Sequence, residues 1–305
     1  MPHSSAPTSF SAHLRRFGWA LADALLYGNG LVAASAAALT AASAYYWRQR
    51  LPWTVPALVF AATLLVYNLN GTRRYRQQLP PGVPARRRWI VQHRVLLTGV
   101  VSASAVVLVA LYVAMWLRNS FAGQLTWFLG HLALLSLAYS WPVLPGRHGG
   151  RRRGLRDVPV LKTLLIGYVW AAVTVWLPAI CTQVSLLSPA GGMLLARRFC
   201  FILAVALVFD LRDYSKDRQS GTPTLPVLLG FQRGRWLALA CVLASAALLL
   251  PGLSVIGQLV LAVPTLLSAL VTWFADETRS DYYFALLADG LLLLQAAALV
   301  AATLA

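Results

Sequence analysis

Carboxylates that could do chemistry gather in one short stretch, positions 209–230, which reads FDLRDYSKDRQSGTPTLPVLLG. Asp210, Asp213 and Asp217 are spaced i, i+3 and i+7, so on a continuous helix they form one acidic stripe. Such carboxylates repel one another, and a hard cation removes the repulsion. Mg²⁺ commonly takes one or two protein carboxylates, the phosphates of its substrate and some water. The stretch therefore predicts a metal and diphosphate site.

A solvated helix end is the alternative interpretation, in which the acids pair with Arg212, Lys216 and Arg218. Composition favours the metal site, because the whole chain of 305 residues has only nine Asp and Glu residues. Three of them fall within eight positions, beside an apolar run of membrane length. In the metal-site interpretation Lys216 is assigned to the substrate diphosphate.

The same stretch resembles the second aspartate motif of the UbiA superfamily of intramembrane prenyltransferases. That motif is DxxxD, followed by a charged residue, a Gly and a Thr-Leu-Pro-Val-like run that ends in Leu-Gly. The matching residues are Asp213, Asp217, Arg218, Gly221, Thr224, Leu225, Pro226, Val227, Leu229 and Gly230. The resemblance implies transfer of an isoprenoid group from a prenyl diphosphate to an aromatic or other acceptor. It makes Asp213 and Asp217 catalytic metal ligands and places Asp210 beside the same metal.

Composition identifies an integral membrane protein of the all-α class. Hydrophobic residues make up 59% of the chain and charged residues 11%, against about 25% charged in ordinary globular domains. The net charge of +17 does not indicate nucleic-acid binding, because the cations form short clusters between apolar runs. Such clusters are typical of topology signals and of contacts to phosphate or membrane lipid. The three cysteines have no spacing typical of a disulfide framework or a zinc site.

Nine apolar stretches are candidates for spanning helices, each of which needs about 20 residues. They are 20–46, 53–70, 95–117, 124–143, 160–180, 193–209, 236–250, 253–273 and 282–305. Residues 1–14 are expected to be disordered, without a cleaved signal, and 15–305 to form a single UbiA-like transmembrane domain.

Lys and Arg are distributed unevenly between the two sides of these nine spans. Assigning loops alternately places 21 of the 26 cations on one side, which the positive-inside rule makes cytoplasmic. We therefore expect a multi-pass protein of the inner, or cytoplasmic, membrane. The N-terminus and the motif loops face the cytoplasm, and the C-terminus lies outside.

The loop after the second apolar stretch departs from the family. UbiA enzymes carry a first motif, NxxxDxxxD, at this place, and it binds a second Mg²⁺. Aligned on Asn68, the two aspartate positions hold Thr72 and Arg76. We expect one Mg²⁺ on the second motif, with Asn68, Arg73 and Arg76 contacting the diphosphate directly, because guanidinium forms forked hydrogen bonds to phosphate. The alternative is that these arginines only fix topology and touch lipid headgroups.

Two further features concern the middle of the chain. Tyr139, Ser140 and Pro142 resemble the family's Tyr-Ser-x-Pro at the end of the fourth helix. Lys162, just before the fifth apolar stretch, is assigned to the phosphate or the acceptor, and the alternative is a snorkelling interfacial lysine.

Polar residues inside apolar stretches are functional candidates, because they are costly in lipid. Asp23 is expected near the cytoplasmic Arg15 and Arg16, and Asn29 to line a cavity or bond a neighbouring helix. Asp289 calls for a buried donor that the sequence does not identify.

The main rival to a prenyltransferase is a protein that kept the fold and lost the transfer reaction, acting as a lipid- or isoprenoid-binding accessory protein without Mg²⁺. A channel or transporter would need a polar pathway through the bilayer, and few intramembrane polar residues are present. No protein partner is predicted. Prenyl chain length, acceptor identity and oligomeric state are not encoded in any motif found.

Overall fold

The computed structural model describes residues 21–74, 85–118, 122–140, 155, 158 and 160–305, without the side chains of 70–74 and 140. None of these residues forms a strand. A first helix covers Leu21–Tyr27. The others are α2 (Gly30–Tyr46), α3 (Thr54–Arg74), α4 (Ala85–Gln92), α5 (Arg94–Arg118), α6 (Ala122–Ser140), α7 (Leu161–Ala171), η3 (Ala172–Trp176), α8 (Leu177–Thr182), α9 (Pro189–Arg212), α10 (Tyr214–Gln219), α11 (Leu225–Leu229), α12 (Phe231–Ala247), α13 (Val255–Trp273), η4 (Tyr283–Ala288) and α14 (Asp289–Leu304).

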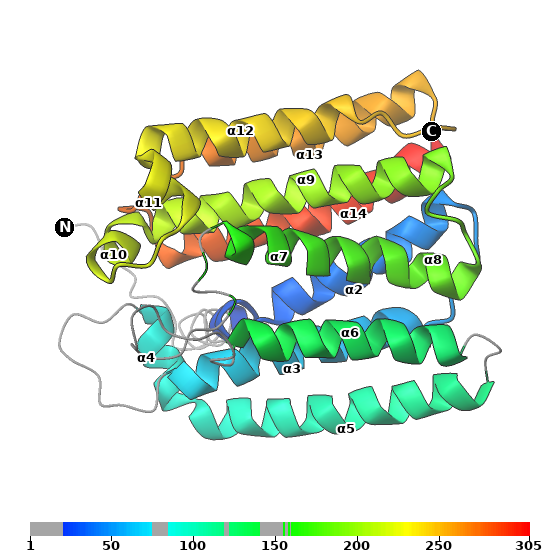
Figure 1. The fold of residues 1–305 in the computed structure, drawn as a ribbon, viewed down its shortest axis with the longest axis horizontal. Coiled ribbons are helices and arrows are strands. Elements are labelled where there is room, and N and C mark those ends of the chain that lie inside the picture. Colours follow the sequence, from blue (N-terminus) through cyan, green and yellow to red (C-terminus); the bar gives the residue numbers. More distant parts are fainter. Residues whose placement is uncertain (1–20, 75–84, 119–121, 141–154, 156–157, 159) are drawn as a thin grey trace, which may run out of the picture.

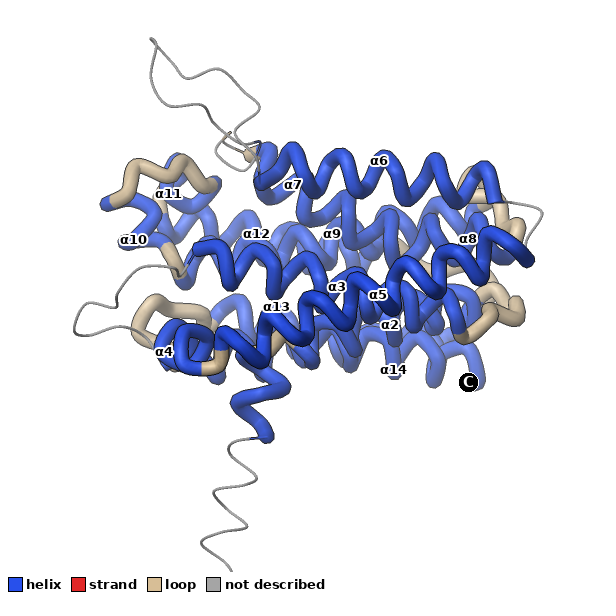
Figure 2. The backbone as a smooth tube through the Cα atoms, turned by 90° about the horizontal axis from the view of Figure 1, so that it is seen from below, coloured by secondary structure: helices blue, strands red, loops and turns tan. Residues whose placement is uncertain are grey.

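The long helices run roughly side by side in one bundle (Figure 1). α9 packs against α7 and α12, and α2 packs against α3 and α14. The short helices α4, α10 and α11 lie together at one end of the bundle, whereas the C-terminus lies at the other end (Figures 1 and 2). We call the end with α4, α10 and α11 the motif end.

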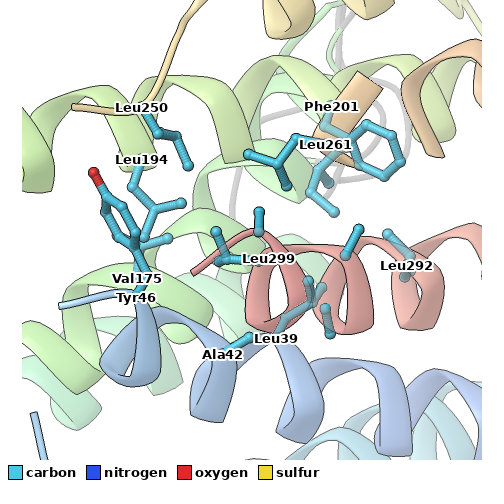
Figure 3. Close-up of a cluster of buried hydrophobic side chains, with 14 of the residues drawn as sticks. Leu39, Ala42, Tyr46, Val175, Leu194, Phe201, Leu250, Leu261, Leu292 and Leu299 are labelled. Carbon is cyan, nitrogen blue, oxygen red and sulfur yellow. The ribbon is translucent and has the colours of Figure 1, made fainter. Parts of the chain in front are cut away.

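The bundle core is made largely of small and branched apolar side chains. Figure 3 shows part of it, where Leu39 and Ala42 of α2 face Leu292 and Leu299 of α14. Helices in lipid gain little from the hydrophobic effect alone, so close packing of small residues and bonds between helices hold them together. The alanine-rich α2 suits this role, since it contacts helices on several sides.

Pro178 explains one of these bonds. Proline has no N–H, so Pro178 leaves the carbonyl of Thr174, four residues earlier, without its helical donor. The hydroxyl of Ser43 on α2 donates to this carbonyl at 2.7 Å. The same stretch forms the π-helical turn η3, a wider turn that is common where a helix ladder is interrupted. The carbonyl that Pro178 leaves without a helical donor thus forms a hydrogen bond between η3 and α2.

The expectation of nine spans is confirmed only in part. By length and apolarity, five helices in the described part of the chain could cross a membrane, or six if the bent pair Leu21–Tyr27 and Gly30–Tyr46 counts as one span. α12 has only 17 residues, and the apolar part of α3, Thr54–Leu69, is also short. The apolar pattern does not show that the chain bends after Tyr27 or that α12 ends at Ala247, so it does not tell which stretches form one long helix.

Candidate functional site at the motif end

The acidic stretch does not form one continuous stripe. α9 ends at Arg212, Asp213 is its C-cap with a φ of −94°, and α10 starts at Tyr214. Asp210 therefore lies in the last turn of α9, while Asp217 lies on a separate short helix. The three carboxylates still act on one another, because the charges of Asp213 and Asp210 both contribute to raising the pKa of Asp217.

Asp210 is buried, with 3% of its surface exposed, and both of its oxygens have partners. Lys162 Nζ on α7 forms an ion pair with Asp210 Oδ1 at 2.5 Å. Thr163 Oγ1 donates to Asp210 Oδ2 at 3.2 Å. The prediction that Asp210 contacts a metal stays a prediction. The observed contacts show that it fixes the lysine predicted to contact the substrate.

Asp213 pairs with its sequence neighbours. Arg212 donates to Asp213 Oδ2 at 3.0 Å, and Lys216 Nζ lies 3.8 Å from Asp213 Oδ1. Burial alone would raise the pKa of the Asp213 carboxyl, but the charges of Arg212 and Lys216 outweigh it and hold that pKa below its ordinary value. The guanidinium of Arg212 also lies 5.0 Å from the ring centre of Phe209. Asp213 is therefore ionised at neutral pH and held in place.

Asp217 carries the unsatisfied oxygen of the site. Its Oδ2 is buried without a hydrogen-bond partner in the described structure. Burial raises the pKa of Asp217, the nearby Lys162 opposes this, and the carboxylates of Asp213 and Asp210 add to the rise. A buried carboxylate oxygen without a partner is costly, so a cation or a donor from a ligand is needed to complete it.

These residues fit a magnesium ion with a small protein ligand set. Among the described residues, no three His, Cys, Asp or Glu side chains are grouped so as to hold a metal. Mg²⁺ needs fewer, since one or two carboxylates suffice when phosphate oxygens and water supply the other positions. The open Oδ2 of Asp217 and the neighbouring Asp213 offer such a set.

The rest of the motif builds a compact turn around Asp217. The amide of Thr222 donates to the backbone carbonyl of Asp217 at 2.8 Å. Gly230 has a φ of +91°, a conformation that other residues rarely adopt, and it is the N-cap of α12. Pro226 of α11 packs so closely on Gly234 that a Cβ added there would lie 2.9 Å from the proline Cβ. Pro226 of the motif and Gly234, four residues beyond it, thus position α11 against α12.

A second polar network joins the start of α2, the end of α3 and α4, also at the motif end (Figure 1). Asn68 is buried, and its Nδ2 donates to the carbonyl of Gly28 at 3.1 Å. Asn29 Nδ2 donates to Asn68 Oδ1 at 3.0 Å, and Arg86 donates to Asn29 Oδ1 at 2.9 Å. The network holds the 63° bend between the first helix and α2. Diphosphate contact by Asn68 stays a prediction, and its observed role is structural.

Arg86 was not among the predicted site residues. One arginine of an Arg-Arg-Arg run after a proline-rich loop gives no local signal that distinguishes it from its neighbours. Of the arginines that were predicted, the side chain of Arg73 and all of Arg76 lie outside the described residues, as do Ser140's side chain and Pro142. Their proposed contacts are therefore still predictions.

The structure also places Asp23 and Asp289, the aspartates of the first and last apolar stretches. Tyr282 donates a hydrogen bond to Asp23, which ties the first helix to the segment before η4. The residues Arg15 and Arg16, expected near Asp23, lie outside the described residues. Asp289 lies where the charges of both Arg86 and Arg212 act on it. It therefore stands between the network of Asn68 and the acidic motif.

Comparison with known proteins agrees with this geometry. The model of the UbiA prenyltransferase family matches residues 85–303. A search of curated protein sequences found no match to this chain. One solved structure, from work on digeranylgeranylglyceryl phosphate synthase in membranes, is similar in fold with a TM-score of 0.57 and 14% identity, over 93% of this chain and 98% of that one. The family match covers well over half of the sequence and includes the whole acidic motif, so the chain belongs to the UbiA prenyltransferase family.

Proposed function

We propose that this protein is an intramembrane prenyltransferase that takes an isoprenoid diphosphate and transfers its prenyl group to a lipid-like or aromatic acceptor. The main observation behind the proposal is that Asp217 Oδ2 is buried without a hydrogen-bond partner in the described structure, beside the ionised Asp213. Membership in the family and the fold shared with a digeranylgeranylglyceryl phosphate synthase support it. That neighbour makes a geranylgeranyl chain and a glycerol-lipid acceptor the first candidates to try.

In this proposal Asp213 and Asp217 hold one Mg²⁺, which when bound would neutralise charge on the leaving diphosphate. Asp210 holds Lys162 at the edge of the site, and Lys216 adds a second ammonium near the diphosphate. Arg86, Arg73 at the end of α3 and Arg76 after it supply positive charge where the missing first motif would have bound metal. The apolar helices accommodate the prenyl tail and exclude water from the reacting carbon.

We also propose that the motif end is cytoplasmic and that the chain crosses the membrane nine times. The first helix joins the motif end through Tyr282 and Asp23, while the C-terminus lies at the opposite end (Figure 1). An odd number of crossings accommodates both positions. A reporter fused after Ala305 should be active only outside the cytoplasm, and activity inside would refute the odd number.

The test of function is turnover by purified protein in lipid nanodiscs with geranylgeranyl diphosphate, Mg²⁺ and candidate acceptors. We expect Asp213→Ala and Asp217→Ala each to lower turnover by about 10²-fold or more, the scale of losing a charge-stabilising group. Arg233→Ala, on the same face of the membrane, serves as a control.

A rival proposal keeps the fold and the binding without the reaction, because Thr72 and Arg76 replace two carboxylates of the first motif. Binding of prenyl diphosphate without turnover of any acceptor or hydrolysis of the diphosphate would favour this accessory role. Absence of both binding and turnover would refute both proposals.

A further inference from the structure

Two adjacent arginines lie inside the bundle, far from the motif end. Arg197 and Arg198 of α9 are each only 5% exposed. Arg198 is nine residues from the start of α9 at Pro189, which is roughly 14 Å along a helix. Ionisable groups at such depth in a membrane protein are rare and costly, and they usually mark a site.

Arg197 is satisfied by the protein. Its guanidinium donates to the carbonyls of Ser245 at 2.8 Å and Leu248 at 3.1 Å, near the C-terminal end of α12. Carbonyls at a helix C-terminus lack helical donors and carry partial negative charge, so they suit a cation. Arg197 also reaches the carbonyl of Leu261 on α13 at 3.4 Å. It links three helices and has a structural role.

Arg198 is different. In the described part of the chain, no hydrogen bond or ion pair joins its guanidinium to a protein group. Eight of the nine acidic residues are described, and they belong to the first helix, the α9–α10 junction and the segment from Asp276 to Asp289. Asp210, on the same helix, is twelve residues away, or about 18 Å. Among the described residues, no carboxylate therefore balances the positive charge of Arg198.

A small cavity adjoins this charge. It is lined by Arg197, Arg198 and Gln295, together with apolar side chains. Figure 3 shows several of the apolar ones, with Leu194 and Leu261 facing Leu299 of α14. The amide Nε2 of Gln295 is buried and has no partner among the described residues, and Gln295 is 7% exposed. Donors from two helices thus line this space, and among the described residues neither the Arg198 guanidinium nor Gln295 Nε2 bonds to a protein acceptor.

The size of the cavity limits what it can hold. Its volume is about 10 Å³, which is close to the minimum of about 10–15 Å³ for one water molecule. A phosphate or sulfate group is too large without rearrangement. A water molecule fits, but it would leave the charge of Arg198 unbalanced, whereas a monatomic anion needs only a slight expansion.

We infer that this cavity is a binding site for a single small halide such as chloride, held by the guanidinium of Arg198 and the amide of Gln295. The anion neutralises Arg198 and joins α9 to α14 in the half of the bundle opposite the motif end. This site is separate from the acidic motif and does not depend on the proposed transferase activity.

The experiment compares thermal unfolding of the purified protein in chloride and in gluconate at equal ionic strength. We expect chloride to raise the melting temperature by about 5 °C, saturating as the site fills. Bromide should replace chloride. In Arg198→Met the dependence on halide should vanish, and this variant should be at least as stable in gluconate as the wild type. Arg50→Met, an exposed arginine, should keep the full response.

Three outcomes would overturn the inference. One is equal stability in all anions, and another is a response retained in Arg198→Met. The third is stabilisation by vesicles containing phosphatidylglycerol but not by chloride in neutral lipid, which would assign the charge to a lipid phosphate. If Arg198→Met does not fold, anomalous scattering from bromide-soaked wild-type crystals provides the test. We expect a bromide peak beside Arg198, and the absence of this peak would contradict the site.

Discussion

The ammonium of Lys162 lies 2.5 Å from the buried Oδ1 of Asp210, although 48 residues separate the two in sequence. The contact joins the start of α7 to the end of α9, directly beside the acidic motif. Lys162 is partly exposed and Asp210 is almost fully buried. The buried carboxylate of Asp210 therefore holds the ammonium of Lys162 in place at the edge of the site.

Removing only the lysine should be costly. Lys162→Met leaves Asp210 charged, buried and without its main partner, so we expect a loss of about 3 kcal/mol in the free energy of unfolding. The double variant Lys162→Met with Asp210→Asn should recover most of this loss, because no buried charge is left. Reversible unfolding in mixed micelles measures both. Additive losses in the double variant would show that the ion pair is not the cause.

The two motif aspartates should respond to pH with opposite signs. The pKa of Asp217 is raised, so its ionised form opposes folding at neutral pH, and this penalty fades as the pH falls through its folded pKa. Without Mg²⁺ at pH 7, Asp217→Asn should therefore be more stable than the wild type, and the difference should shrink towards pH 4. Melting temperature measured against pH gives the result.

Asp213 supplies the matched comparison. Its pKa is lowered, so the ionised form stabilises the fold above the ordinary pKa of an aspartate, and this is lost as the pH falls through the lower folded value. Asp213→Asn should be less stable than the wild type at pH 7. If both asparagine variants shift stability in the same direction, the assignment of unequal environments is wrong.

We expect Arg86 to contribute to the binding of the prenyl diphosphate donor. We expect Arg86→Gln to weaken binding of prenyl diphosphate by about tenfold, which corresponds to losing one charge-assisted hydrogen bond of about 1.5 kcal/mol. Arg88→Gln, an exposed residue of the same helix, should bind normally. Titration calorimetry measures the affinity. Because Arg86 also holds Asn29, the melting temperature must be followed in parallel, and an unchanged affinity would confine Arg86 to a structural role.

A double-mutant cycle can test whether the missing N–H of Pro178 is the reason for the hydrogen bond from Ser43 to the Thr174 carbonyl. Ser43→Ala should cost about 1 kcal/mol, since it leaves a carbonyl unpaired in the membrane core. In a Pro178→Ala background the helix regains its own N–H donor, so the same serine substitution should cost much less. Unfolding of the four proteins completes the cycle, and equal costs in both backgrounds would contradict the explanation.

The sequence predicted best what is local. The spacing of Asp213 and Asp217 and the Pro and Gly of the tail depend on residues within 22 positions, and in the structure these residues form the short helices α10 and α11 that follow α9. The expected stripe was wrong in detail, because the chain leaves the helix at Asp213. No residue there forbids a longer helix, so tertiary contacts decide where α9 ends.

Long-range partners could not be predicted. Asp289 was expected to need a donor, and Arg86 acts on it from a segment about two hundred positions away. Hydropathy likewise found the apolar stretches, but it does not show where a helix bends or ends, and five or six of the described helices are long and apolar enough to span a membrane. Contacts between residues that are far apart in the sequence can be identified only once the fold is known.

The wide turn η4 determines how the two ends of the last helix are rotated relative to each other. A π-helical turn accommodates one residue more than a regular turn, so everything beyond it is rotated by about 100° relative to an uninterrupted helix. Before the turn, Tyr282 must face Asp23. After it, Gln295 must face the cavity by Arg198. A deletion of one residue here would leave only one half of the helix in phase with its neighbours, so η4 sets the rotation that lets Tyr282 reach Asp23 while Gln295 lines the cavity.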